Sequence, residues 1–336
     1  MSQHITHLRD LGPEGVAKIL TQAAAWKQSP PGPLFAGKLL AMVFFNPSLR
    51  TRASFEAAML RHGGHAIVLE VGNGTWKLED RDGVVMDGDR AEHVKEAVPV
   101  LARYADALAL RAFSSGVSDE EDEADGVLAA FRAHSPVPLI SMESAREHPC
   151  QGLADLLTVQ ETFGTTKVPV TLTWAPHLKP LPKAVPNSFL LTAAACGAEI
   201  TVAHPEGYEL TPAVRAEAEA LAKRTGGSVR FTHNQGEALK GAKAVCAKAW
   251  GPATGGIALP MSQLGSWMPT AAHMRVAAED AIFLHCLPVR RNLEVHDSVL
   301  DGPWSRVVEE AENRFHVQRA LLASMFNDMP VTKERL

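Results

Sequence analysis

Short apolar runs alternate with helical patterns along this chain, and this alternation limits the folds open to it more than any other feature. Runs such as Leu39–Phe45 and Ala107–Leu110 are apolar throughout, which is typical of parallel strands covered on both faces. The alternation of such runs with helices predicts α/β folding around parallel sheets. In the first half the other predicted strands are Ala66–Leu69 and Pro138–Ser141, and the predicted helices are Ser54–His62, Ala91–Arg103 and Glu123–His134.

The pattern restarts after the break at Pro149, where Gly152–Phe163 has apolar residues at helical spacing and could connect two halves. We therefore predict two doubly wound parallel-sheet domains joined by helices, with the active site in the cleft between them. The proline-rich segment Trp174–Pro186 is predicted as an ordered loop. Predicted elements of this half are the strands Val168–Trp174, Glu199–Ala203, Ser228–Thr232, Ala244–Ala247, Ala281–Leu284 and Arg306–Val308, and the helices Asn187–Cys196 and Glu312–Phe326.

Composition excludes several classes of partner. The chain has 336 residues, enough for about two domains, and a net charge of -5, so nothing indicates a nucleic-acid or membrane partner. Its 4 cysteines lack C-x-x-C spacing, which favours free thiols in the cytoplasm. The 14 histidines are scattered without zinc-type spacing, so we expect no metal and no cofactor. No apolar run reaches the length of a signal core or a membrane span.

The segment Phe45–Glu56 reads as a cradle for a phosphate group. It lies between a predicted buried strand and a predicted helix, and a helix N-terminus attracts anions through its free N–H groups. Ser48 and Thr51 can add hydroxyl donors, and Arg50 and Arg52 can add charged ones. An ordinary capped helix with solvated arginines is the alternative, and two arginines within the cap turn make it the weaker interpretation.

Three segments together resemble the aspartate and ornithine carbamoyltransferase superfamily. Ser48-Leu49-Arg50-Thr51-Arg52 resembles its Ser-x-Arg-Thr-Arg signature, His148-Pro149-Cys150-Gln151 its His-Pro-x-Gln, and His285-Cys286-Leu287-Pro288 its His-Cys-Leu-Pro. They occur in the family's order and at family-like separations. The resemblance implies a carbamoyl-phosphate-binding domain over residues 1–150, completed by a C-terminal helix at about 312–336, and an amine-binding domain over 151–311.

The resemblance also implies roles for individual residues. Thr51, Arg111 and His148 would polarise the carbamoyl carbonyl, with Gln151 nearby. The resemblance implies that Cys286 and Leu287 contribute backbone carbonyls. A nucleophilic Cys286 is disfavoured, because no base is evident that could activate its thiol. Carbamoyl phosphate would be held by Ser48, the backbone of Leu49, Arg50, Thr51 and Arg314.

The sequence differs from the better-known members of the superfamily at positions that bind the second substrate, and these differences limit which amine it can be. The Ser-Met-Gly loop by which ornithine carbamoyltransferases grip a charged α-amino group is replaced by Ala247-Lys248-Ala249-Trp250-Gly251. The chain is more similar to the branch that acts on N-acetylornithine, whose uncharged α-nitrogen needs no carboxylate partner. Lys248 is expected to bind the α-carboxylate, and Glu143 and Glu92 to face the acylated substrate. Glu92 would repel a succinyl carboxylate, which favours acetyl over succinyl.

Two further residues carry expectations from the same branch. Trp76 would enter the active site of a neighbouring subunit, which implies a homotrimer, whereas the alternative is a tryptophan anchoring its own loop. Glu294 occupies a position where some relatives have a carboxylated lysine, and it would supply the same negative charge near Lys248 without modification. An exposed loop glutamate is the alternative.

The favoured function is therefore carbamoyl transfer from carbamoyl phosphate to the side-chain amine of N-acetylornithine, in arginine biosynthesis. N-succinylornithine and ornithine are alternative amines. A non-catalytic binding relative is a more remote alternative, because it would have little reason to keep Arg111, His148 and Lys248 together. A dinucleotide-binding protein is disfavoured because no G-x-G-x-x-G follows the first strand of either half.

Overall fold

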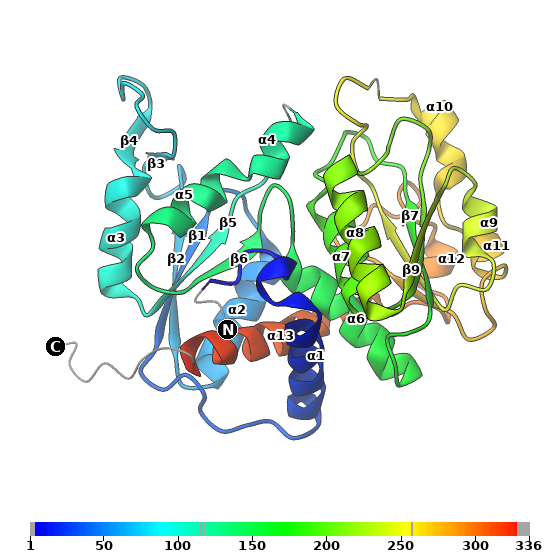
Figure 1. Cartoon of the computed structure of the whole chain (residues 1–336), viewed down its shortest axis with the longest axis horizontal. Helices are drawn as coiled ribbons and strands as arrows, with labels where there is room; N and C mark the ends of the chain where they lie inside the picture. The colour runs from blue at the N-terminus through cyan, green and yellow to red at the C-terminus, as the bar shows by residue number, and fades with distance from the viewer. Residues whose placement is uncertain (1–3, 115, 117, 257, 328–336) are drawn as a thin grey trace.

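Two parallel sheets organise the protein, and the computed structural model describes residues 4–327 except 115, 117 and 257. Figure 1 shows the sheets in two lobes with helices around and between them. This arrangement confirms the predicted fold class. The first sheet has the order β2-β1-β5-β6, formed by β1 (Leu39–Phe44), β2 (His65–Glu70), β5 (Ala107–Arg111) and β6 (Leu139–Glu143). The second has the order β11-β10-β7-β8-β9, formed by β7 (Pro169–Trp174), β8 (Glu199–Ala203), β9 (Ser228–Thr232), β10 (Ala244–Lys248) and β11 (Ile282–Leu284).

Helices cover both faces of each sheet, which explains why the strands are apolar almost throughout. Every residue of β5 and of β6 is buried. The helices of the first lobe are α1 (Gly12–Gln28), α2 (Leu49–Arg61), α3 (Val94–Tyr104), α4 (Asp119–Ala124) and α5 (Gly126–His134). Those that follow the second sheet's strands are α7 (Ala184–Ala195), α8 (Pro212–Thr225), α9 (Gln235–Leu239), α10 (Met261–Leu264), α11 (Ala271–Met274) and α12 (Asp297–Leu300). Short 3-10 turns lie at Leu8–Asp10 and Gly265–Trp267.

Two long helices join the lobes. Helix α6 (Pro149–Phe163) is buried at every position from 149 to 159, as expected for a helix surrounded by protein. Helix α13 (Val307–Asn327) follows the second sheet in the chain but packs against α6 and against α1 and α2 of the first lobe. Figure 1 shows this return, with the red end of the chain beside the blue α1. No helix in the described part of the chain is long and apolar enough to cross a membrane.

The strand orders create one switch point in each sheet. The chain moves outward from β1 to β2 on one side and from β5 to β6 on the other, so the loops after β1 and β5 diverge. The loops after β7 and β10 diverge in the same way in the second sheet. Crevices at such points are where open α/β sheets bind ligands.

Several predicted elements have other bounds in the structure. The strand expected at Arg306–Val308 is wrong: residues 304–306 touch the edge of β11, with Phe283 N donating to Trp304 O at 2.7 Å, and α13 begins at Val307. Residues 91–93 of the expected helix Ala91–Arg103 belong to β4 (Arg90–His93), which pairs with β3 (Lys77–Glu79). The expected helix Glu123–His134 is interrupted at Asp125, whose φ is 49°. The proline-rich loop ends before Pro186, because α7 accepts this proline in its first turn.

Candidate active site

A cavity of about 540 Å³ opens between the two switch points. Its walls come from the segments that follow β1, β5 and β6 in the first sheet and β7, β10 and β11 in the second, together with α13. The cavity is lined by all predicted site residues except Trp76 and Glu92. These lining residues are Ser48, Leu49, Arg50, Thr51, Arg111, Glu143, His148, Gln151, Lys248, Cys286, Leu287, Glu294 and Arg314.

The N-terminus of α2 forms one end of the cavity. Ser48 is its N-cap, and its hydroxyl accepts a hydrogen bond from Thr51 N at 3.2 Å. The Arg50 guanidinium has a buried Nε without a partner in the described part of the chain. Arg52, in contrast, pairs with Glu56 and Glu70 away from the cavity. The end of α2 therefore offers backbone N–H groups and one free cation to an anion.

Two buried arginines converge on the hydroxyl of Thr51. Arg314 Nη2 donates to Thr51 Oγ1 at 2.9 Å, and Arg111 Nη1 lies 3.5 Å from the same oxygen. Arg111 also pairs with Glu143, the residue beside it in the register of β5 and β6. Arg314 comes from α13 and donates to Gln151 Oε1 at 2.8 Å. Arg50, Arg111 and Arg314 thus lie around one helix N-terminus.

His148 is held in its neutral form beside this cluster. Burial and the nearby charges of Arg314, Arg111 and Arg50 lower the pKa of its imidazole well below the ordinary value. Its backbone N–H donates to Ser188 Oγ at 2.6 Å, where α6 meets α7. Its Nδ1 is buried and has no protein partner in the described part of the chain. A neutral imidazole with a free nitrogen suits hydrogen bonding to a substrate.

A pair of buried carboxyl groups lies behind Gln151, and the sequence analysis did not single it out. Gln151 Nε2 donates to Asp155 Oδ1 at 2.7 Å and to Glu310 Oε1 at 2.9 Å. Burial raises the pKa of Asp155 to about 6, and burial together with the nearby Asp155 raises the pKa of Glu310 well above its ordinary value. The other oxygen of Glu310 accepts from His285 N at 2.7 Å. The pair therefore links α6 and α13 to the segment after β11.

The opposite end of the cavity combines a lysine with a carboxylate. Lys248 Nζ lies 3.8 Å from Glu294 Oε1, and His285 Nε2 lies 3.2 Å from the same oxygen. Although burial favours the neutral carboxyl, His285 and Lys248 lower the pKa of Glu294 to about 2. Glu294 is therefore ionised and only 1% exposed, which excludes the exposed loop glutamate considered above. Burial raises the pKa of Cys286 to about 12, so its thiol is no nucleophile near neutral pH.

Family models match both halves of the chain. The aspartate/ornithine carbamoyltransferase carbamoyl-P binding domain matches residues 3–161, and the Asp/Orn binding domain of the same enzymes matches residues 182–325. The chain belongs to the aspartate/ornithine carbamoyltransferase family.

Individual members of this carbamoyltransferase family are similar over most of their length. The chain is 40% identical to the N-acetylornithine carbamoyltransferase of Xanthomonas campestris, over 96% of this chain and 97% of that one. It is 41% identical to the N-succinylornithine carbamoyltransferase of Bacteroides fragilis, over 87% and 89%. A solved structure of acetylornithine transcarbamylase complexed with acetylcitrulline superposes with a TM-score of 0.89 at 39% identity, covering 96% of this chain and 98% of that one.

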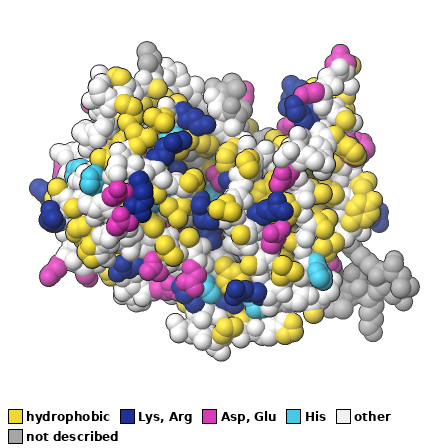
Figure 2. Space-filling model, turned by 180° about the vertical axis from the view of Figure 1, so that it is seen from behind, with side chains coloured by type: hydrophobic (Ala, Val, Ile, Leu, Met, Phe, Trp, Pro, Cys, Tyr) yellow, Lys and Arg dark blue, Asp and Glu magenta, His cyan; other side chains and the backbone are white. Residues whose placement is uncertain are grey.

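Trp76 and Glu92 lie apart from the carbamoyltransferase cavity of their own chain. Glu92 belongs to β4 and Trp76 directly precedes β3, and the small β3–β4 sheet projects from the first lobe in Figure 1 and at the upper right of Figure 2. Trp76 is 60% exposed, and its Nε1 donates to Glu92 Oε2 at 2.6 Å. Trp76 is thus no core anchor, and neither residue reaches the cavity that contains Glu143.

Several cavity residues of this carbamoyltransferase were missed by the sequence analysis. His177 and Lys179 come from the loop after β7, and Arg290 from the segment after β11. Arg290 Nε and His177 Nε2 lie 3.2 Å apart, so the two segments meet at the rim. The proline-rich composition predicted an ordered loop here, but nothing in the pattern indicated which of its side chains face inward.

Proposed function

We propose that this chain transfers the carbamoyl group of carbamoyl phosphate to the side-chain amine of N-acetyl-L-ornithine, giving N-acetyl-L-citrulline and phosphate. One observation carries the choice of reaction: Arg111 and Arg314 converge on the Thr51 hydroxyl at a helix N-terminus. Such a constellation suits a substrate that has a phosphate and a carbonyl oxygen next to each other. The relatives named N-acetylornithine carbamoyltransferase support the choice of amine, and arginine biosynthesis is the pathway proposed.

The phosphate would bind at the N-terminus of α2. Ser48, the backbone of Leu49, Arg50 and Thr51 would donate to its oxygens, with Arg314 as a further cation. Burial lowers the pKa of Arg314, and the nearby charges of Arg111 and Arg50 lower it further, so an anion between these cations would favour the charged form of Arg314. Binding of the dianion would relieve this repulsion.

The carbonyl oxygen of the carbamoyl group would face Thr51, Arg111 and His148. As the amine nitrogen attacks, the C=O oxygen gains negative charge, and fixed donors stabilise it more in the transition state than in the ground state. A new C–N bond forms, the C–O bond to phosphate breaks, and the amine proton leaves with the phosphate. His148 is neutral and can donate through one nitrogen, while Glu143 lies 3.5 Å from its Nε2.

The amine substrate would enter from the Lys248 end. The backbone carbonyls of Cys286 and Leu287 would accept from the carbamoyl NH₂ and from the incoming amine, which must be uncharged to attack. Leu287 has a φ of 53°, a conformation rare for a residue with a side chain. Its segment lines the cavity in this conformation. Lys248 would hold the α-carboxylate, and Glu294 would fix the position of Lys248.

The carboxylates of the cavity support an acylated α-nitrogen over a free ammonium. Among the described lining residues, the carboxylates are Glu143 and Glu294, and both already have basic partners: Arg111 for the first, Lys248 and His285 for the second. A free α-ammonium group of ornithine would find no spare partner there. This argument favours an acyl-ornithine, in agreement with the absence of a Ser-Met-Gly loop.

The acyl group would be read by the β3–β4 sheet of a neighbouring subunit. Because Trp76 is exposed and lies outside its own cavity, it is available to a neighbouring one. Glu92 accepts a hydrogen bond from Trp76, so it would enter the neighbouring site together with Trp76 and would repel a succinyl carboxylate there. We propose a homotrimer in which each site is completed in this way, and the four free cysteines support a cytoplasmic location.

The test is phosphate release from carbamoyl phosphate with N-acetylornithine, N-succinylornithine and ornithine as separate amines. Turnover with N-acetylornithine alone is expected. A Glu92→Pro variant should gain activity with N-succinylornithine, because the repelling carboxylate is removed. Preference of the unmodified protein for N-succinylornithine would keep the chemistry and overturn the specificity. Release with none of the amines would favour a binding protein without catalysis.

A further inference from the structure

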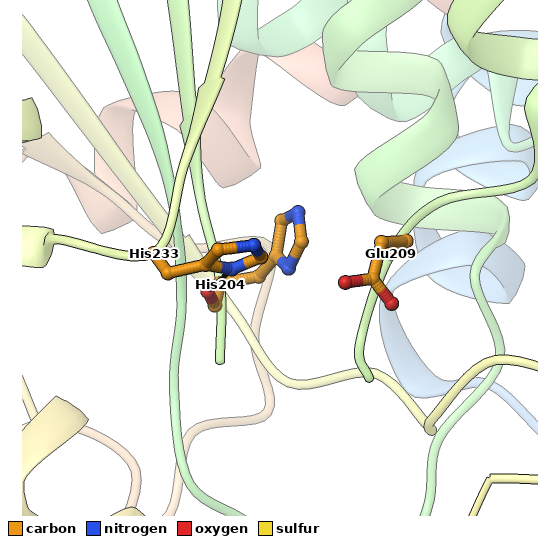
Figure 3. A group of neighbouring side chains, drawn as sticks. All are labelled: His204, Glu209 and His233. Atoms are coloured by element: carbon orange, nitrogen blue, oxygen red, sulfur yellow. Dashed lines mark hydrogen bonds between the residues drawn. The ribbon is translucent and has the colours of Figure 1, made fainter. Parts of the chain in front are cut away.

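A second cluster of ligand-type side chains lies at the far end of the second sheet. Among the described residues, His204, Glu209 and His233 form the group of histidine and carboxylate side chains whose ligand atoms all lie within 4.8 Å of one another. His204 directly follows β8, and His233 directly follows the neighbouring β9. Figure 3 shows the Glu209 carboxylate facing the ring of His204, with the ring of His233 on the other side. We propose that this cluster binds a divalent transition-metal ion of the Zn²⁺ type.

The hydrogen bonds of the two imidazoles favour metal binding. His204 Nδ1 lies 2.8 Å from Pro205 O, and His233 Nδ1 lies 3.0 Å from His204 O. A backbone carbonyl can only accept, so each Nδ1 carries a proton, and in the neutral ring Nε2 is then the nitrogen with the free lone pair. This is the arrangement typical of metal-binding histidines, whose second nitrogen donates to a carbonyl or carboxylate.

Charge supports the same conclusion. Burial lowers the pKa of His204, so its imidazole is neutral and available as a ligand. Glu209 has a lowered carboxyl pKa, with hydrogen bonds from backbone N–H groups outweighing the effect of burial, and it is ionised. Two imidazoles and one carboxylate form a His₂Glu set, which binds Zn²⁺ and leaves a further position for water.

The fit requires a small adjustment. Donor atoms at about 2.0–2.2 Å from a tetrahedral ion lie roughly 3.4 Å from one another, so separations of up to 4.8 Å would have to shorten by at most about 1.4 Å. His204 is buried, whereas Glu209 is half-buried and His233 is exposed. The two less buried side chains have room to close on His204.

An ion here would act on the segment that leads to the amine end of the cavity. The loop between His204 and Glu209 contains Tyr208, whose backbone carbonyl accepts from Trp250 Nε1 at 2.7 Å. The ring of Trp250 also contacts that of His204, with centroids 6.5 Å apart. Trp250 follows Lys248 by two residues, so a metal ion would stiffen the support of Lys248 while remaining outside the catalytic cavity.

The test is a titration of the metal-free protein with Zn²⁺ by calorimetry, and with Co²⁺ by visible absorption. We expect one site per chain, a Co²⁺ spectrum without thiolate charge-transfer absorption, and thermal unfolding shifted upward by Zn²⁺ but not by Mg²⁺. The variants His233→Ala and Glu209→Gln should bind Zn²⁺ at least about tenfold more weakly. His65→Ala is the matched control, since it removes an exposed histidine at the start of β2 and should bind as the unmodified protein does.

Equal Zn²⁺ affinity in His233→Ala, Glu209→Gln and the unmodified protein would overturn the proposal, as would a thiolate band or no binding at all. Circular dichroism of the metal-free variants checks that they are folded. Because both altered side chains lie at the surface and outside the carbamoyltransferase cavity, phosphate release without added metal should be unchanged in both.

Discussion

Glu294 Oε1 lies 3.2 Å from Nε2 of the fully buried His285, whose other ring nitrogen, Nδ1, accepts a hydrogen bond from Leu287 N at 3.0 Å. Because Nδ1 is an acceptor, the neutral ring carries its proton on Nε2, which lies close to the carboxylate without the geometry of a hydrogen bond. One carboxylate thus lies beside both the ammonium of Lys248 and the histidine that accepts from the backbone of Leu287. The two groups proposed to meet the amine substrate share a single support.

Removal of this support should affect the amine substrate selectively. Glu294→Ala leaves Lys248 without its carboxylate, so we expect the KM for N-acetylornithine to rise about tenfold or more, equivalent to roughly 1.4 kcal/mol. The KM for carbamoyl phosphate should stay within about twofold. Glu294→Gln keeps the shape and an acceptor for His285, and should lie between the two proteins. Steady-state kinetics with each substrate varied would measure this, and an unchanged KM for N-acetylornithine would contradict it.

His148 should matter for turnover more than for binding. Loss of a donor that stabilises a developing oxyanion costs about 10²–10³ in kcat, so His148→Gln should reduce kcat by this order with a small change in KM. His65→Gln serves as a control for histidine replacement. Since the pKa of His148 is well below its ordinary value, its protonation should not reduce kcat between pH 7 and about 6. A loss of kcat at pH 6 that His148→Gln abolishes would argue for a charged imidazole.

The Asp155–Glu310 pair should make stability depend on pH in a defined direction. Both carboxyl pKa values are raised by folding, so the folded protein binds more protons than the unfolded chain above the ordinary values of 3.8 and 4.5. The contribution of this pair to stability should therefore fall as the pH rises from about 4 through 6. Glu310→Gln should flatten this dependence in urea unfolding measured at several pH values.

Glu310→Ala provides the contrast to Glu310→Gln. It removes the acceptor of His285 N and one acceptor of Gln151 Nε2, so buried donors are left unpaired. We expect about 2–4 kcal/mol of destabilisation at every pH. An identical pH dependence in Glu310→Gln and the unmodified protein would show that the pair does not share its titration.

The contribution of Trp76 to a neighbouring site can be tested by mixing two inactive variants. A Trp76→Ala subunit has an intact cavity with Arg111, and an Arg111→Ala subunit has an intact Trp76 that can enter the cavity of a neighbour. If they are refolded together at equal amounts, roughly a quarter of all sites, about one in each mixed trimer, should combine an intact cavity with an intact Trp76, and activity should return. Mixing either variant with the double variant should restore nothing. If every mixture remained inactive, Trp76 would not contribute to the site of a neighbouring subunit.

Contiguous patterns explain what the sequence could predict. The strands Glu199–Ala203 and Ser228–Thr232 agree with β8 and β9 residue for residue, because short runs with β-branched residues between helical patterns leave little choice. The β3–β4 sheet was missed because its strands are short and mostly polar, and pair through tertiary contact. The turn at Asp125 was missed for a similar reason, since a positive φ at an aspartate leaves no periodic signal.

The residues of the candidate site also fall into those that the sequence could indicate and those that only the fold brings together. Residues inside compact motifs, such as Ser48 and Gln151, could be named in advance because the motif itself is dense in functional groups. Asp155 and Glu310 are 155 positions apart, and His204 and His233 belong to different strands. Only the packing of α6 on α13, and of β8 beside β9, brings each pair together. Partners of this kind are a property of the folded topology, with no spacing to reveal them.

The return of α13 to the first lobe also sets the order in which the enzyme can be made. Helix α2, with Ser48 and Thr51, is translated before either sheet is complete, whereas Arg314 belongs to α13, which follows every described strand of both sheets. The end of α2 therefore lacks one of its arginines until α13 has been translated and has packed back on the first lobe. A chain that stopped before α13 would contain the strands of both sheets and still have an incomplete cavity.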